Sequence, residues 1–200
     1  YFRFKQIPHQ WIIRSAATMD EFAKFAKLPI IPLLVTPQLE GAQDSTLVIE
    51  QLEALHPKDS IYPEDTTVNF VSTLLEEFGD EWANKWMFHC RWARDIDQIA
   101  SAGRIAQLTQ PDASSEQLGE LTEQVRQRMV GRVGFVGSNA ETAPQIEASL
   151  HLALEQLEVH LESRPYLLGG RPSFGDFSLW GQLYNVWTDP TNCALIEAKM

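Results

Sequence analysis

The spacing of apolar residues changes near residue 58. Before it, short apolar runs alternate with short helical patterns; after it, apolar residues recur at intervals of three and four over long segments. The first pattern is typical of an α/β unit and the second of packed helices. The sequence therefore predicts an α/β domain at 1–57, a polar, proline-bearing linker at 58–66 and an all-α bundle at 67–200.

The first domain is predicted to run helix, strand, helix, strand, strand, helix. Ile7-Pro8 ends the first helix, because the residue before a proline disfavours the helical region. Thr18 is predicted to cap the second helix. The expected elements are the end of a helix at 1–7, a strand at 9–14, a helix at 18–27, a strand at 33–35, a short strand within 39–43 and a helix at 45–56.

The second domain is predicted to be helical throughout. Its expected helices are one or two at 67–100, one at 115–130, one beginning after Thr142 and one beginning near Ser173. Thr142 and Gln145 have the spacing of a capping box. The helix that follows places one apolar stripe at intervals of three and four, which we expect to be buried: Ile146, Leu150, Leu154, Leu157 and Leu161.

The charge of the chain argues against nucleic acid as a partner. The 16 basic and 27 acidic residues give a net charge of −11, whereas nucleic-acid binders usually carry a clustered basic face. Residues 1–57 hold 5 basic and 6 acidic residues, so nearly all the negative charge lies in the second part. This asymmetry also favours two domains over one.

The cysteines and the chain ends bear on location. Cys90 and Cys193 are far apart and form no metal-binding pair, which favours a reducing compartment, the cytoplasm. No apolar run is long enough to cross a membrane, and no signal peptide is visible. The chain begins at Tyr1 within a helical pattern and ends at Met200 without a helix stop signal, so we expect further sequence at both ends.

Two short features near the end of the first domain could bind a ligand. A cis bond before Pro32 would turn the main chain of Ile31 outward, where it could pair with an extended peptide. Asp44-Ser45 opens a helix whose amino end favours a carboxylate, while Asp44 could accept from an ammonium group. The simpler alternatives are a trans proline that bounds a strand and a residue pair that only caps a helix.

Together, these features resemble the glutathione-binding half of the glutathione transferase superfamily. The resemblance implies a thioredoxin-like domain whose first strand is absent from this chain. It implies that Ile31 offers its main chain to the cysteinyl part of glutathione, that Pro32 is cis, and that Asp44 and Ser45 hold the γ-glutamyl end. Glutathione would be the co-substrate, and no metal site is expected.

The second domain supports the resemblance independently. The segment RPYLLGGRPSFGD ends in an S-x-x-D capping box formed by Ser173 and Asp176. A similar segment opens a buried helix in the family, so we assign both residues to structure. Gly175 stands where the family usually has alanine, and it should weaken the helix by up to about 1 kcal/mol.

The resemblance implies a transferase that conjugates glutathione to an apolar electrophile, in detoxification, usually as a homodimer. Its mechanism would be activation of the glutathione thiolate by a hydroxyl or thiol at the first strand. This chain begins after that point, so the catalytic residue is unknown and Tyr1 is not a candidate. The alternative is a non-catalytic binding module with the same fold.

An aromatic stripe in the first long helix has two interpretations. Phe78, Trp82, Trp86, His89 and Trp92 recur at intervals of three and four. They could wall a pocket for the second substrate, with Trp86 and His89 as its contacts, or they could pack in the helical core. The packing interpretation is favoured.

Overall fold

A computed structural model describes residues 1–198 and divides the chain into two units. Unit 1 comprises residues 1–60 and 107–113, and unit 2 comprises residues 61–106 and the chain from 114 onward. The boundary near residue 60 lies inside the linker predicted from the sequence. None of the helices described is long and apolar enough to cross a bilayer.

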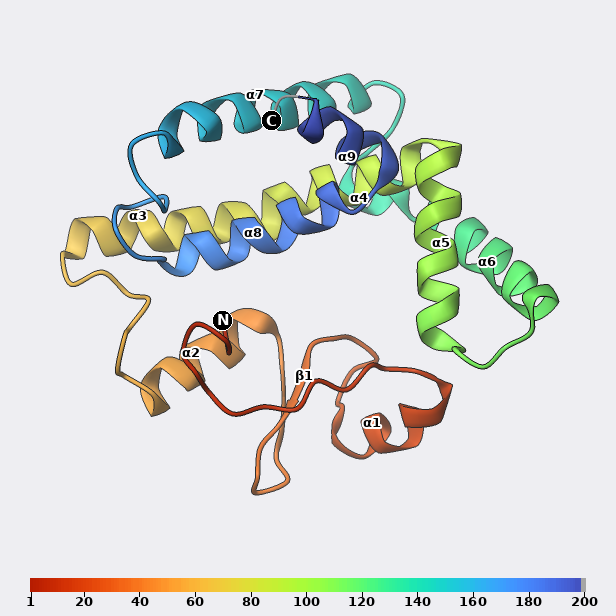
Figure 1. The fold of residues 1–200 in the computed structure, drawn as a ribbon, viewed down its shortest axis with the longest axis horizontal. Helices are drawn as coiled ribbons and strands as arrows, with labels where there is room; N and C mark the ends of the chain where they lie inside the picture. The colour runs from red at the N-terminus through yellow and green to blue at the C-terminus, as the bar shows by residue number, and fades with distance from the viewer. Residues whose placement is uncertain (199–200) are drawn as a thin grey trace. The chain divides into compact units, whose positions relative to one another are not determined.

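Unit 1 contains a two-stranded antiparallel sheet and short helices (Figure 1). Its elements are a 3-10 turn at Ala16–Thr18, α1 at Met19–Phe25, β1 at Leu33–Val35, β2 at Gly41–Gln43 and α2 at Ser45–Leu55. These confirm the predicted hairpin and the helix after it, and α1 is shorter than expected. A thioredoxin-like architecture needs more sheet than these two strands provide.

One of the two predictions for the start of the chain is wrong. Residues 1–7 form a last helical turn, in which the Lys5 N–H donates to the Tyr1 carbonyl, and Gln6, with a φ of 54°, ends it before Pro8. Residues 9–14 form no strand. Trp11 is 81% exposed. A strand exists only where a neighbour supplies its hydrogen bonds, and in the part of the chain that the structure describes β1 and β2 pair only with each other.

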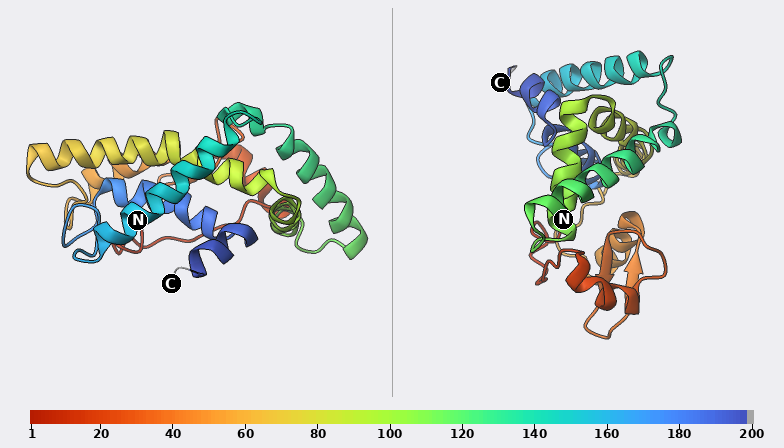
Figure 2. Two further views of the ribbon diagram at one scale, coloured as in Figure 1. Left: turned by 90° about the horizontal axis from the view of Figure 1, so that it is seen from above. Right: turned by 90° about the vertical axis from the view of Figure 1, so that its right-hand side faces the viewer.

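Unit 2 is built from helices. They are α3 at Thr66–Glu77, α4 at Ala83–Ala93, α5 at Asp95–Thr109, α6 at Ser115–Val130, α7 at Ala143–Leu161, α8 at Phe174–Trp187 and α9 at Pro190–Glu197. Unit 2 is thus helical, as predicted. The segment at 67–100, predicted as one or two helices, contains α3, α4 and the start of α5, and α9 was not predicted. Figure 2 shows α6 reaching outward from one end of the unit.

A π-helical turn at Phe78–Trp82 joins α3 to α4, so the two form one rod. In Figure 1, α8 lies along this rod, with close contact to both helices. The main core of unit 2 lies between α4, α7 and α8: Ala83, Trp86, Cys90, Ile146, Leu150, Leu167, Leu179 and Val186. Leu161, predicted to be buried, is 41% exposed because it is the last residue of α7.

Small residues allow α8 to approach the rod closely. A Cβ atom on Gly175 would lie 2.6 Å from the Leu75 Cβ, and one on Gly79 would lie 2.8 Å from the Leu179 backbone nitrogen. Both distances are shorter than real Cβ contacts. Gly175 therefore belongs to the interhelical contact, and the expectation that it only weakens α8 is incomplete.

The loop before α8 is held by Asp176. Its carboxylate accepts from the Ser173 N–H at 2.8 Å, the Ser173 hydroxyl at 2.7 Å and the Leu167 N–H at 2.9 Å. The structural role predicted for Ser173 and Asp176 matches these contacts. The capping box predicted at Thr142 is wrong: its hydroxyl donates to the Gly137 carbonyl, and the Asn139 side chain accepts from the Thr142 N–H instead.

Candidate functional site

The hairpin of unit 1 brings together the two segments that the sequence singled out. Its register pairs Leu33 with Gln43 at the open end. Pro32 directly precedes Leu33, and Asp44 directly follows Gln43. The Ile31-Pro32 and Asp44-Ser45 segments therefore both lie at this open end of the hairpin.

The Ile31-Pro32 peptide is cis, as expected from the resemblance. The Ile31 side chain is 67% exposed, which is unusual for a large aliphatic residue beside a sheet.

Gln43 fixes the loop that leads to Ile31. Its side-chain oxygen accepts from the Lys27 N–H at 2.8 Å and the Leu28 N–H at 3.0 Å. Its amide nitrogen donates to the Leu28 carbonyl at 2.9 Å and the Ile30 carbonyl at 2.8 Å. Four hydrogen bonds thus use this amide fully. No signal in the sequence predicted this positioning role.

The Asp44 side chain caps the amino end of α2. One carboxylate oxygen accepts from the Thr46 N–H at 3.0 Å and the Leu47 N–H at 3.3 Å. The capping interpretation of Asp44 is therefore confirmed. Two helix N–H groups that we had considered free for a ligand carboxylate are already bonded, and the exposed Ser45 supplies the other donors at this helix end.

The backbone of Asp44 is strained. Its φ of 78° and ψ of 119° lie outside the regions that residues with a Cβ ordinarily occupy. Such a conformation costs about 1–3 kcal/mol and is found most often at binding and catalytic sites. Strain, exposure and the neighbouring cis peptide thus coincide at the open end of the hairpin.

The two residues predicted for the second-substrate pocket lie in the core of unit 2. Trp86 is 1% exposed and donates its indole N–H to the Ser149 hydroxyl at 2.7 Å. His89 is 3% exposed and lies 2.7 Å from the Ser138 hydroxyl and 3.2 Å from the Glu147 carboxylate. Both are packing residues with satisfied polar atoms, as the favoured alternative predicted.

Ser138, His89 and Glu147 form a hydrogen-bonded series in the order of a nucleophile, a base and an acid. A substrate could not reach the Ser138 hydroxyl, however, because the serine is buried beside His89. Burial alone would raise the pKa of Glu147, but the contacts with His89 and Arg94 outweigh it and lower that pKa below its usual value. The set connects α4, α7 and the loop between α6 and α7.

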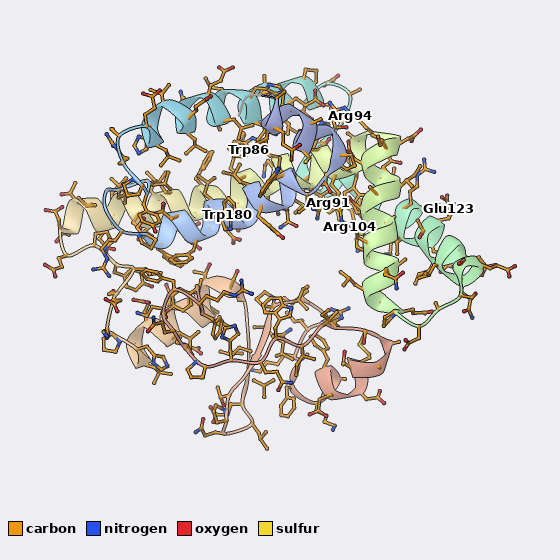
Figure 3. The ribbon with its side chains drawn as sticks, in the orientation of Figure 1. Trp86, Arg91, Arg94, Arg104, Glu123 and Trp180 are labelled. Carbon is orange, nitrogen blue, oxygen red and sulfur yellow. The ribbon has the colours of Figure 1, made fainter. Side chains whose placement is uncertain are left out.

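Aromatic residues that the sequence did not single out are exposed on α8. Trp180 is 57% and Tyr184 50% exposed, with ring centroids 5.9 Å apart. Figure 3 labels Trp180 on α8. Trp180 and Tyr184 are thus accessible aromatic residues of unit 2, whereas Trp86 is not.

A second polar cluster ties α4 and α5 to the start of α9. The Asp189 carboxylate is fully buried and accepts from the Arg91 Nε at 2.9 Å, the Ser101 hydroxyl at 2.8 Å and the Arg104 guanidinium. Figure 3 shows Arg91 and Arg104 near each other. Donors from α4 and α5 thus match the buried Asp189 carboxylate, which gives the cluster a structural role.

Comparison with known families bears on unit 2. The family model described as "Glutathione S-transferase, C-terminal domain" matches residues 123–191. This part of the chain, about a third of its length, is thus similar to the C-terminal domain of glutathione S-transferases. The resemblance inferred from the sequence is confirmed for this part, which spans α7 and α8 with the Ser173–Asp176 loop. Searches of curated proteins and of solved structures gave no match.

Proposed function

We propose that this chain is part of a glutathione transferase-like protein, in which unit 1 belongs to a thioredoxin-like domain that binds glutathione. The observation that carries the proposal is the family match over residues 123–191. The mostly helical unit 2, with its capped α8, accords with it. The protein is expected to act in the cytoplasm as a homodimer, on a small apolar electrophile.

Glutathione would bind at the open end of the unit 1 hairpin. The Ile31 main chain would pair with the cysteinyl part, which is extended and has one N–H and one C=O to satisfy. The amino end of α2 would attract the γ-glutamyl carboxylate, with the Ser45 hydroxyl as a donor. Asp44 bonds to the helix through one carboxylate oxygen, and its charge would attract the γ-glutamyl ammonium.

The proposed chemistry is conjugation through the glutathione thiolate. A hydrogen bond to the sulfur anion would lower the thiol pKa, and the thiolate would attack the electrophile and displace its leaving group. Neither cysteine of the chain would itself serve as a reactive thiolate. Burial raises the pKa of Cys90 to about 11, and the hydrogen bond with Glu197 raises the pKa of Cys193.

The second candidate is a binding module that keeps the tripeptide site without turnover. The two candidates share the binding site and differ only in thiol activation.

Glutathione titration by calorimetry tests the shared part, and ultraviolet absorbance of the bound thiolate tests the activation. Binding with a thiolate signal and turnover of an aryl halide supports the transferase. Binding without either supports the module. Glutathione that fails to bind a folded sample would overturn both.

A further inference from the structure

A cavity of about 380 Å³ lies within unit 2, between α4, α7 and α9. Its volume falls within the range of small-molecule sites, roughly 300–1,000 Å³. Leu150, Ala194 and Leu195 give it apolar walls, and Cys90 and Asn192 also line it. All the residues that line it belong to unit 2, and none of them is among those proposed to bind glutathione.

Asn192 is an unusual lining residue. It is 5% exposed, and its side-chain nitrogen is one of three buried side-chain polar atoms among residues 1–198 that have no hydrogen-bond partner. Within the cavity this amide interacts with the Cys90 thiol, but a neutral thiol is only a weak acceptor. A buried unpaired donor is costly, so an oxygen acceptor brought into the cavity would gain a hydrogen bond there.

The charges around the cavity favour a neutral ligand. The Arg94 guanidinium is paired with the Glu147 carboxylate, so this cation is already neutralised. The Asp97 carboxylate is buried next to α9, where it accepts from the Thr191 N–H at 2.9 Å. A ligand carboxylate would meet the Glu147 carboxylate and no unpaired lysine or arginine among the lining residues, and unpaired buried charge is strongly disfavoured.

We propose that this cavity is a binding site for small, neutral, apolar molecules that carry one carbonyl oxygen, which accepts a hydrogen bond from the Asn192 side-chain amide. The apolar body of the ligand lies against Leu150, Ala194 and Leu195. The raised pKa of Cys90, caused mainly by burial, keeps its thiol neutral and adds no negative charge to the cavity.

Three probes of similar size separate these contributions. Acetophenone has the carbonyl oxygen, ethylbenzene lacks it and benzoate carries a charge. Binding to the whole chain is measured by ligand-observed NMR titration. Acetophenone should bind roughly five- to tenfold more tightly than ethylbenzene, the value of about one hydrogen bond, and benzoate should bind the weakest.

Two variants test whether the probes bind in this cavity. Asn192→Leu should reduce acetophenone affinity to that of ethylbenzene and leave ethylbenzene binding unchanged. Ala194→Trp, at an exposed position of the lining, should block all three probes, and circular dichroism confirms that each variant folds. Equal binding of acetophenone and ethylbenzene to the unaltered chain would overturn the proposal without any variant. So would acetophenone binding that Ala194→Trp leaves intact.

Discussion

Ser45 occupies the first position of α2, next to a residue that caps the helix through its own side chain. Because Asp44 makes the cap, Ser45 is free to vary without loss of the helix. We expect Ser45→Ala to weaken glutathione binding by roughly 1–2 kcal/mol, the value of one hydrogen bond to a charged group. Calorimetric titration measures the affinity, and the unfolding midpoint should stay near that of the unaltered protein.

Asp44→Asn tests the second residue proposed to hold the γ-glutamyl end of glutathione. Asparagine caps helices about as well as aspartate, so the substitution removes the charge and keeps the cap. Weaker glutathione binding with unchanged stability is expected. If both variants bind glutathione as tightly as the unaltered chain, the open end of the hairpin does not hold the γ-glutamyl group.

Asp176, in contrast to Ser45 and Asp44, should affect stability and not glutathione binding. Its carboxylate holds Ser173 and Leu167 through three hydrogen bonds, and its removal leaves donors in a largely buried loop unpaired. We expect Asp176→Ala to lower the free energy of unfolding by about 2–4 kcal/mol, since bonds to a charged group are worth more than neutral ones. Urea unfolding measures the loss, with the exposed Asp112→Ala as control. Lost glutathione affinity at full stability would show that its role is not structural.

At the scale of the elements, the pairing of α8 with the α3–α4 rod depends on glycine. Alanine has the higher helix propensity by about 1 kcal/mol, but a Cβ on Gly175 meets the Leu75 Cβ at 2.6 Å and the Ser72 carbonyl oxygen at 3.1 Å. Gly175→Ala should therefore destabilise unit 2 by roughly 1–3 kcal/mol, the usual cost of overpacking.

Gly181 supplies a control in the same helix. A Cβ there meets nothing within 4 Å, so Gly181→Ala should stabilise the protein by up to about 1 kcal/mol through helix propensity alone. Thermal unfolding of the two variants should give shifts of opposite sign. Shifts of the same sign would contradict the close approach of α8 to the rod.

Local signals in the sequence predicted the elements that depend on local physics. The apolar period located α6 and α7, and the S-x-x-D spacing located the start of α8. Features that depend on tertiary partners were not predicted. The strand expected at 9–14 has no neighbour to pair with, and the π turn at Phe78–Trp82 lies where Gly79 meets α8.

The candidate site was predictable in its parts but not in its geometry. The sequence singled out Pro32 and the Asp44-Ser45 pair, because proline and helix-opening residues carry recognisable signals. It could not show that the hairpin brings both segments to its open end. It also missed Gln43, since a glutamine that bonds four main-chain groups looks like any other polar residue until the loop around it is known.

At the scale of the whole molecule, the net charge of −11 makes stability sensitive to pH. Most acidic residues are exposed, but Glu147 joins α7 to Arg94 and to the buried His89. Burial opposes its ionisation, and these two partners outweigh that effect, so its pKa in the folded protein lies below the usual 4.5. The charged form of Glu147 is therefore favoured by folding.

The sign of the pH effect follows from this lowered pKa. A carboxyl group whose pKa is lowered by folding stabilises the protein above its unfolded pKa, and this contribution disappears as the pH falls through the folded value. Glu147→Gln should reduce the free energy of unfolding at neutral pH, and the difference from the unaltered protein should shrink below a pH of about 4. Urea unfolding across this range measures the difference. The exposed Glu141→Gln, only six positions away, is the control and should give a small difference at every pH. A Glu147→Gln difference that grows as the pH falls would mean that burial of this carboxylate, and not its ion pair, dominates its energetics.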